Sequence, residues 1–310
     1  MAQNRFLPPQ PTILKNVSCP YCGTQLDDQN RSKEHAVARS SVPKGSLDGA
    51  WNLILNACKA CNGAKSDLED DIPAISMQPD PTGRHPREDP RLIKDAARKG
   101  AKSWSRLTGM PVGKSTVRQT FNFSLGPGMT VSVGSVGPPQ VEESRVFALA
   151  WYQLAAFFYF VTYDDQSKTG KHWPGEFVPV MQSVRSDWGN VRLRAFTDAV
   201  ANWLPRLCGM TAGGFLRVAI RRKTGADCWS WALEWNESIR VIGFFGDPAE
   251  METAVAHLPE PEMHTLGRER GPAGATIRLR EEVPVKEGDQ DKLFAWEEPQ
   301  PPRDEPPKTL

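Results

Sequence analysis

The chain has 310 residues, of which 39% are hydrophobic and 24% are charged, and its formal net charge is +1. This composition is typical of a soluble globular protein, and the length is sufficient for two domains. A net charge near zero excludes a simple polybasic coat, so local charge is more informative than the total. We expect a cytoplasmic protein, because the N-terminus lacks the basic and apolar segments of a secretion signal.

The first third of the chain contains few long periodic segments. Residues 1–14 are expected to form a loose leader, and the four prolines within residues 78–90 indicate a linker or an extended strap. Residues 91–104 suit a basic helix. Residues 115–136 predict a β-hairpin, because strand-forming residues flank a Gly-Pro-Gly turn.

The second half of the chain combines helical and strand patterns. Helices are expected at 143–163, 190–207 and 248–257, and strands at 215–223, 228–235 and 238–246. The apolar run 146–163 favours a buried core helix over a membrane span, because it contains Gln153 and is shorter than the roughly 20 apolar residues that a span needs.

The composition changes again at the C-terminal end. The last thirty residues hold nine acidic side chains, four basic side chains and six prolines, which predicts a disordered acidic tail. Residues 291–298 form a small apolar island in this tail, which docks either onto the body of the protein or onto a partner.

This order of elements predicts an α+β fold. A small zinc-stapled N-terminal module is followed by a larger mixed α+β domain and the tail. The expected boundaries are a leader at 1–14, the module at 15–75, a basic linker and helix at 76–114, the α+β domain at 115–280 and the acidic, proline-rich tail at 281–310.

Four of the six cysteines form two CxxC pairs, Cys19 with Cys22 and Cys58 with Cys61. Two such pairs supply the four soft ligands of a structural zinc site. The 35 residues between the pairs exceed the usual spacing of a zinc ribbon, so a folded insertion is expected there. The single residues Cys208 and Cys228 are expected to be buried, inert thiols.

The segment between and after the pairs carries polar residues in a distinctive order. A Glu34-His35 dipeptide comes first, then Asn52-Leu53, and then Cys61-Asn62 with Lys65 three residues further on. This arrangement resembles the HNH endonuclease family, in the branch with two CxxC pairs. The resemblance covers about 55 residues, and it implies a ββα unit that binds one catalytic metal ion.

The resemblance implies a role for each of these residues. His35 matches the general base, and an imidazole suits this task because its ordinary pKa is near 6.5. Glu34 and Asn62 match the ligands of a catalytic Mg²⁺ or Mn²⁺ ion, while Zn²⁺ in the four thiolates is structural. Asn52 matches the middle asparagine, which holds the loop that follows His35. Lys65 matches a basic position near the scissile phosphate.

Two features depart from the family pattern or leave a choice open. Many members have a proline shortly after the catalytic histidine, whereas the first proline after His35 here is Pro43. Asn56 is an alternative to Asn52 for the middle position. Asn52 is preferred because it precedes Leu53, and Asn56 then satisfies backbone groups near the cysteines.

Residues 84–118 hold ten lysines and arginines against three acids. Such a stretch suits contact with a phosphate backbone, although a solvated helix face gives the same pattern. Trp104 lies within it and is expected to belong to the core rather than to stack on a base. The residues expected to bind nucleic acid are Arg39, Lys65, Arg91, Lys94, Arg98, Lys99 and Lys102.

The sequence therefore predicts a metal-dependent HNH endonuclease that nicks DNA. The α+β domain is expected to serve regulation, targeting or partner docking, as in bacterial or phage restriction and antiviral defence systems. One alternative is a zinc-ribbon module that binds nucleic acid without catalysis. Another is an adaptor in which the larger domain acts alone. No membrane contact is expected.

Overall fold

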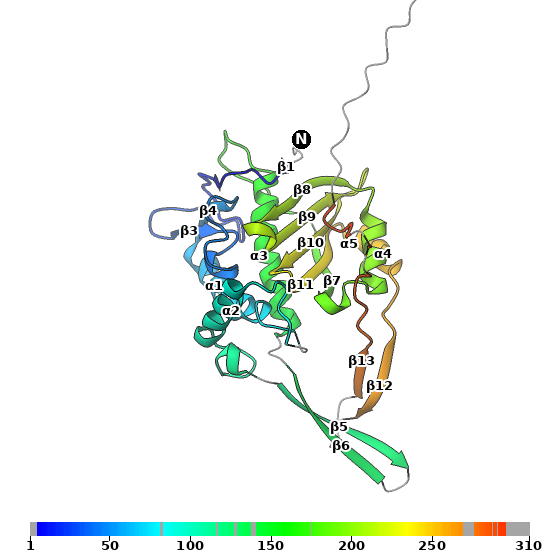
Figure 1. The fold of residues 1–310 in the computed structure, drawn as a ribbon. Coiled ribbons are helices and arrows are strands. Elements are labelled where there is room, and N and C mark those ends of the chain that lie inside the picture. The colour runs from blue at the N-terminus through cyan, green and yellow to red at the C-terminus, as the bar shows by residue number, and fades with distance from the viewer. Residues whose placement is uncertain are drawn as a thin grey trace, which may run out of the picture.

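The computed structural model describes residues 5–80, 83–115, 117–126, 129–137, 141–173, 175–268, 276–286, 288–289 and 291–295. It has a mixed α+β architecture, as the order of elements predicted. A six-stranded sheet lies at the centre, and one long helix separates it from the N-terminal module (Figure 1). Two further helices cover the other face of the sheet.

The central sheet has the strand order β1-β8-β9-β10-β11-β7. Its strands are β1 (Arg5–Phe6), β7 (Glu176–Val184), β8 (Leu204–Thr211), β9 (Leu216–Arg222), β10 (Cys228–Trp235) and β11 (Ile239–Gly246). All neighbours are antiparallel except β1 and β8. Every residue of β10 and β11 is buried, since both faces of the sheet are covered.

Three of these strands confirm the sequence prediction, and the other three were not predicted as strands. The predicted strands at 215–223, 228–235 and 238–246 are β9, β10 and β11. The helix predicted at 190–207 ends earlier, because its last residues belong to strand β8. The expected loose leader at 1–14 was wrong for its described part, since it supplies β1 to this sheet and β2 (Thr12–Ile13) to the N-terminal sheet.

Helix α3 (Glu143–Val161) packs between the central sheet and the N-terminal module. Among the described residues it is the helix whose length and apolar composition would allow it to cross a membrane. In the fold, 67% of its apolar window is buried. Gln153 lies in this interior and accepts a hydrogen bond from the indole of Trp235 at 2.8 Å. The helix is therefore a core helix, as expected.

Helices α4 (Val191–Val200) and α5 (Pro248–Ala256) cover the opposite face of the sheet. Asp247 caps α5 by accepting a hydrogen bond from the backbone N–H of Glu250, and Pro248 fills the first turn. Phe196 of α4 packs against Phe244 of β11, with ring centroids 5.2 Å apart. A second, smaller apolar cluster results on this face.

The N-terminal module consists of a three-stranded sheet and one helix. Its elements are β2, β3 (Arg31–His35), β4 (Leu53–Cys58) and α1 (Lys59–Ser76), with the order β2-β4-β3 in the sheet. The antiparallel pair β3–β4 followed directly by α1 has the ββα order that the resemblance implies. A short 3₁₀ turn, η1 (Arg39–Ser41), lies in the loop between the strands.

The module and the central sheet share one hydrophobic core. Trp51 of the module packs against Phe157 and Phe160 of α3, with ring centroids 5.8 and 6.1 Å apart. Residues of β4 and α1 belong to the same buried cluster as residues of β9, β10 and β11. The two parts of the chain are therefore expected to unfold together.

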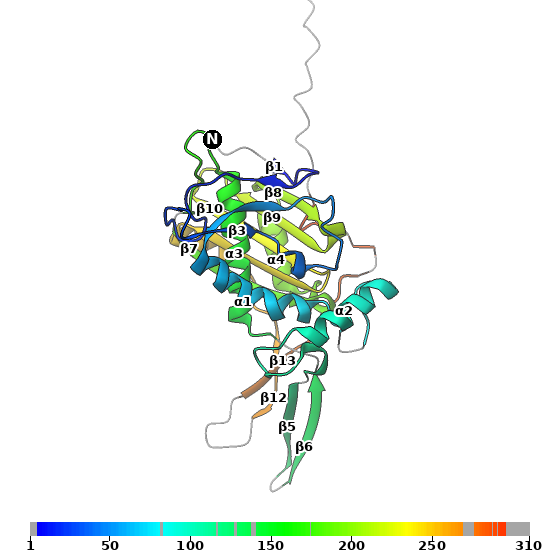
Figure 2. The ribbon, with the colours of Figure 1, turned by 90° about the vertical axis from the view of Figure 1, so that its left-hand side faces the viewer.

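Helix α2 (Pro90–Lys102) lies beside the C-terminal half of α1 (Figure 2). The strap that leads to it is fixed by Arg87, whose guanidinium makes two hydrogen bonds to the Glu237 carboxylate at 2.6 and 2.9 Å. The same guanidinium lies 4.4 Å from the ring centroid of Phe215. These contacts tie the linker to the turn between β10 and β11.

Two ribbons extend from the body on its lower side in Figures 1 and 2. The first pairs β5 (Val117–Gly126) with β6 (Met129–Gly137) and confirms the predicted hairpin. The second pairs β12 (Met263–Arg268) with β13 (Thr276–Arg280). The remaining 3₁₀ turns are η2 (Val112–Lys114), η3 (Arg185–Asp187) and η4 (Ala212–Gly214).

The apolar island of the tail docks onto the body. Leu293 is buried in the cluster beneath α4, and the Arg221 guanidinium donates to the carbonyl oxygens of Leu293 and Ala295 at 3.3 and 2.9 Å. Asp291 forms an ion pair with Arg240. Of the two alternatives for this island, the described part adopts the intramolecular one, whereas residues 296–310 of the predicted tail lie outside the described residues.

Candidate active site

The four paired cysteines converge at the end of the module that faces α3. Their Sγ atoms all lie within 4.8 Å of one another, and those of Cys22 and Cys58 are 3.7 Å apart. A tight turn presents the first pair, because the N–H of Gly23 donates to the carbonyl of Cys19 at 2.9 Å. Cys58 caps α1, so the second pair is held by the start of the helix.

This cluster fits a tetrahedral zinc ion. With Zn–S bonds of about 2.3 Å, the corners of a tetrahedron are about 3.8 Å apart, close to the observed Cys22–Cys58 separation. Four thiolates leave no open position for water, which is the chemistry of a structural site. The cluster could thus hold a metal ion that joins the β-hairpin to the helix, and the CxxC spacing predicted this grouping of the four cysteines.

His35 ends strand β3 and is half-buried. Burial lowers the pKa of its imidazole below the ordinary value of 6.5, and the nearby positive charges of Lys33 and Arg39 act in the same direction. The ring is therefore mainly neutral at pH 7, which is the form that can accept a proton. Lys33 and Arg39 are exposed and flank the ring with positive charge.

Asn52 holds the loop that follows His35. Its amide makes two hydrogen bonds to the backbone of Val37, donating to the carbonyl at 2.8 Å and accepting from the N–H at 3.3 Å. Asn56 instead exchanges hydrogen bonds with Asn16 near the cysteines. These contacts suit the loop-holding role for Asn52 and the backbone-satisfying role for Asn56.

Glu34 and Lys65 meet inside the module, on the side of β3 that faces α1. The Lys65 ammonium lies 2.6 Å from Glu34, 2.6 Å from Glu69 and 2.9 Å from the carbonyl oxygen of His35. Lys65 has no exposed surface, and Glu34 is 4% exposed. All three ammonium protons thus have an acceptor, and Lys65 does not reach the surface where a phosphate would bind.

The expected divalent ion does not fit this arrangement. Lys65 already neutralises the Glu34 carboxylate, which also accepts a hydrogen bond from Tyr21 at 3.2 Å. Asn62, the other implied ligand, donates to the hydroxyl of Ser32 at 3.0 Å. A second cation beside the Lys65 ammonium would be repelled at this short range.

Replacing Lys65 by methionine is expected to destabilise the protein strongly. The variant would leave Glu34 and Glu69 buried without their shared cation, and removal of one partner of a buried ion pair costs about 3–5 kcal/mol. The free energy of unfolding in urea measures this loss. Lys59→Met, on an exposed residue of the same helix, is the matched control. Equal stability of the two variants would contradict the buried network.

Asn52 and Asn56 give a matched pair for testing the loop that follows His35. Asn52→Ala removes two buried hydrogen bonds and is expected to cost about 1–3 kcal/mol, whereas Asn56→Ala removes one partly buried hydrogen bond, to the carbonyl of Asn16, and should cost less. Only Asn52→Ala releases the Val37 backbone, so only this variant should also lower phosphodiester cleavage per folded molecule. Plasmid nicking at a temperature where both variants are folded measures the difference. Equal loss of cleavage in both would remove the special role of Asn52.

The residues predicted to bind nucleic acid lie in three environments. Exposed side chains are found at Arg39, Arg91, Lys94, Arg98 and Lys102. Lys99 points inward between α1 and α2, where burial lowers its pKa to about 8. Lys65 is fully buried. The expectation that Trp104 belongs to the core was wrong, because 53% of its surface is exposed.

The larger part of the chain braces the loop between β3 and β4 at two points. The Asn236 amide donates to the carbonyl of Ser41 at 3.0 Å, and the Thr211 hydroxyl donates to the carbonyl of Trp51 at 2.5 Å. Asn236 and Glu237 both have φ of 54°, the left-handed region that a tight hairpin turn requires. The His35 loop is therefore shaped by contacts from outside the module.

Lys33 is the residue at this site that sequence reasoning missed. In a β-strand, residues two apart lie on the same face, so Lys33 accompanies His35 while Ser32 and Glu34 face α1. This alternation was a usable signal. It also separates the motif residues, because Glu34, Asn62 and Lys65 gather on the opposite face of β3 from His35.

Comparison with protein-family models, with curated proteins and with solved structures finds no match to this chain.

Proposed function

We propose that this protein is an endonuclease that hydrolyses phosphodiester bonds in DNA, with His35 as the general base. The observation that carries the proposal is a half-buried histidine at the end of β3, in a hairpin that four cysteines join to a helix, with burial lowering the pKa of its imidazole. Asn52 fixes the loop that follows this imidazole. Zn²⁺ bound by the four cysteines is proposed to be structural.

Four residues of the chain have a role in the proposed hydrolysis. His35 takes a proton from the attacking water, and the oxygen–phosphorus bond then forms as the bond to the leaving sugar oxygen breaks. Lys33 and Arg39 provide the positive charge that holds the phosphate beside the imidazole. The Lys65 ammonium fixes the carbonyl of His35 and so positions the base from behind.

A catalytic Mg²⁺ or Mn²⁺ ion at Glu34 and Asn62 is the further expectation from the HNH resemblance. It requires Lys65 to release the Glu34 carboxylate, because the two are 2.6 Å apart. The dependence of cleavage on Mg²⁺ or Mn²⁺ is therefore measured directly in the assay for the proposed function. A single active site cuts one strand at a time, so nicking rather than double-strand cleavage is proposed for the monomer.

We further propose a cytoplasmic setting, where a reducing environment keeps the zinc-binding thiols free. The large α+β part would serve regulation, targeting or docking to partner proteins. Restriction or antiviral defence in bacteria or phages is the context that the resemblance suggests.

A plasmid-nicking assay tests the proposed function. Purified protein is incubated with supercoiled plasmid in EDTA, Mg²⁺ or Mn²⁺, and the open-circular product is measured. Nicking in Mg²⁺ or Mn²⁺ alone would support the nuclease and the metal expectation, whereas nicking in EDTA would support the nuclease without a catalytic ion. Absence of nicking in all three, with zinc still bound, would contradict the proposal.

A nucleic-acid-binding module without catalysis is the second candidate. The observation that favours it is the buried Glu34–Lys65 pair, since the acid and the lysine of the motif are both engaged with each other. This candidate predicts DNA binding with no cleavage, and with equal affinity in His35→Ala and the parent protein.

A further inference from the structure

The loop between α2 and η2 presents apolar side chains to solvent, and it lies beside α1 and at the base of the β5–β6 ribbon (Figure 2). The inference drawn from it rests on the proposed function, because it concerns the kind of DNA that the protein binds. Two consecutive parts of the loop are paired, since Trp104 and Pro111 form an isolated antiparallel bridge. The N–H of Ser105 also donates to the carbonyl of Met110 at 2.8 Å.

Several contacts hold this loop in one shape. The N–H of Gly109 donates to the carbonyl of Ser105 at 2.9 Å, and Gly109 has φ of 64°, which favours glycine. The loop is attached to α1 because the N–H of Arg106 donates to the Asp71 carboxylate at 2.9 Å. Its outward side chains are therefore held in place before any partner binds.

The polarity of the loop is the reverse of the usual pattern. Its small polar residues face inward, with Ser103 7% and Ser105 2% exposed. Its large apolar residues face outward, with Trp104 53%, Leu107 45% and Met110 39% exposed. Three large, partly exposed apolar side chains on one short, fixed loop suit a binding surface. We call Trp104, Leu107 and Met110 the apolar loop face.

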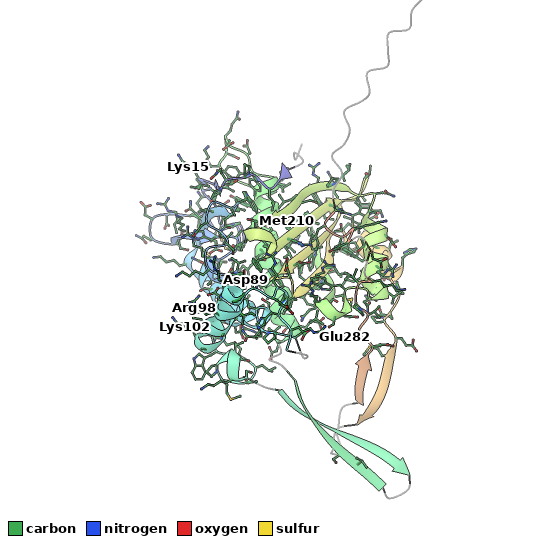
Figure 3. All side chains as sticks on the ribbon, in the orientation of Figure 1. Lys15, Asp89, Arg98, Lys102, Met210 and Glu282 are labelled. Atoms are coloured by element: carbon green, nitrogen blue, oxygen red, sulfur yellow. The ribbon has the colours of Figure 1, made fainter. Side chains whose placement is uncertain are left out.

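The surroundings of the apolar loop face are positively charged. Residues 91–114 contain seven lysines and arginines and a single acid, Asp95. The side chains of Arg98 and Lys102 project outward from α2 on the same side of the molecule (Figure 3). Three of these cations are engaged within the protein: Arg106 pairs with Asp67 and Asp70 of α1, Arg98 pairs with Asp95, and Lys99 points inward. Positive charge around a small apolar surface is complementary to nucleic acid, where phosphates surround stacked bases.

We propose that the apolar loop face contacts nucleobases and that the protein prefers DNA in which bases are unpaired or easily unstacked. Trp104 would stack on an exposed base, and Leu107 and Met110 would fill the space that the displaced base leaves. The exposed cations of α2 would hold the flanking phosphates. The substrate class is therefore duplex DNA with a bubble, a flap or a distorted step.

Binding to two labelled oligonucleotides tests this inference. Fluorescence anisotropy compares a 30-base-pair duplex with the same duplex carrying a central unpaired bubble, using full-length His35→Ala protein so that nothing is cleaved. We expect the bubble to bind more tightly. Trp104→Ala should weaken bubble binding on the order of tenfold, because stacking on one base contributes that much, and should leave duplex binding almost unchanged.

Matched variants distinguish a base contact made by Trp104 from the effect of a positive charge and from the effect of any other exposed apolar side chain. Met210→Ala changes another exposed apolar side chain, on β8, and should not alter binding to either DNA (Figure 3). Lys102→Ala should weaken binding to both DNAs and reduce its salt dependence. A 2-aminopurine base in the bubble should be quenched by the His35→Ala protein and not by the protein that also carries Trp104→Ala.

The inference is overturned if Trp104→Ala binds the bubble as tightly as its parent, or if the 2-aminopurine signal does not change. Binding of the same proteins to vesicles that contain anionic phospholipid is measured in parallel. The inference is also overturned if Trp104→Ala weakens binding to these vesicles and to neither DNA. Failure of the proposed function looks different. In that case the wild-type protein would not nick plasmid, while the bubble preference and its loss in Trp104→Ala would persist.

Discussion

His35→Ala is expected to abolish plasmid nicking while leaving the fold and the bound zinc intact. Loss of a positioned general base typically lowers the rate by about 10²–10⁴-fold. The side chain is half-buried at the end of β3, and the neighbouring Lys65 contact uses the backbone carbonyl of residue 35, which alanine keeps. Nicked product per folded molecule and the zinc content are the two measurements.

His257→Ala is the control for this substitution, because His257 is an exposed histidine at the end of α5, on the opposite side of the central sheet. It should nick DNA at the rate of the unmodified protein. A zinc-loaded His35→Ala protein with normal nicking would remove His35 as the base. Loss of both zinc and folding in the His35→Ala protein would contradict the expectation that His35 does not support the four-cysteine site.

The pH profile gives a second readout for His35. Burial and then the charge of Lys33 lower the pKa of the imidazole, so cleavage should decline only as the pH falls through a value below 6.5. Protonation removes the base, which fixes the sign of the effect. Lys33→Ala should move this decline to higher pH, because one of the charges that disfavour the protonated ring is gone.

Cys58→Ser is expected to unfold far more than the N-terminal module. Structural zinc sites stabilise small modules by about 10–16 kcal/mol in isolated peptides, which is comparable to the total stability of a typical domain, about 5–15 kcal/mol. Because Trp51, Leu53 and Leu55 lie in the same hydrophobic core as β9, β10 and β11, loss of the metal should destabilise the central sheet as well. Removal of zinc by a chelator should have the same effect.

Cys228→Ser is the matched control for the zinc site. Cys228 is fully buried, and burial raises the pKa of its thiol to about 11, but it does not belong to the four-cysteine cluster. This variant should keep its zinc and a single cooperative thermal transition. If Cys58→Ser instead lost only the signal of the module and kept a folded sheet, the shared core would not couple the two parts.

Secondary structure was predicted correctly from the sequence where a local pattern determines it. The strands β9, β10 and β11, the hairpin β5–β6 and helix α5 with its Asp247 cap all follow from spacing, turn residues and capping. The CxxC spacing likewise predicted the four-cysteine cluster. These features depend on residues that are close in sequence or, for the cysteines, on two CxxC pairs that together supply four zinc ligands.

Prediction failed where distant contacts decide the outcome. Residues 204–207 have a helical pattern but begin β8, because Leu204, Pro205 and Leu207 pair with residues of β9, across an irregularity between Pro205 and Leu207. Arg5 and Phe6 look like part of a leader, yet they pair with residues 207 and 208. The sequence could not show that Lys65 reaches Glu34 and Glu69 or that Trp104 points outward, since both depend on how α1 and α2 pack.

The two hydrogen bonds that brace the His35 loop have a consequence for synthesis on the ribosome. Their donors, Thr211 and Asn236, lie 160 and 195 residues after the carbonyl groups that they bind. The ββα unit leaves the ribosome first but lacks these supports until most of the chain has been made. Under the proposed function, the nascent chain would therefore carry its active site in an unfinished form, and cleavage would become possible only after Asn236 has been translated.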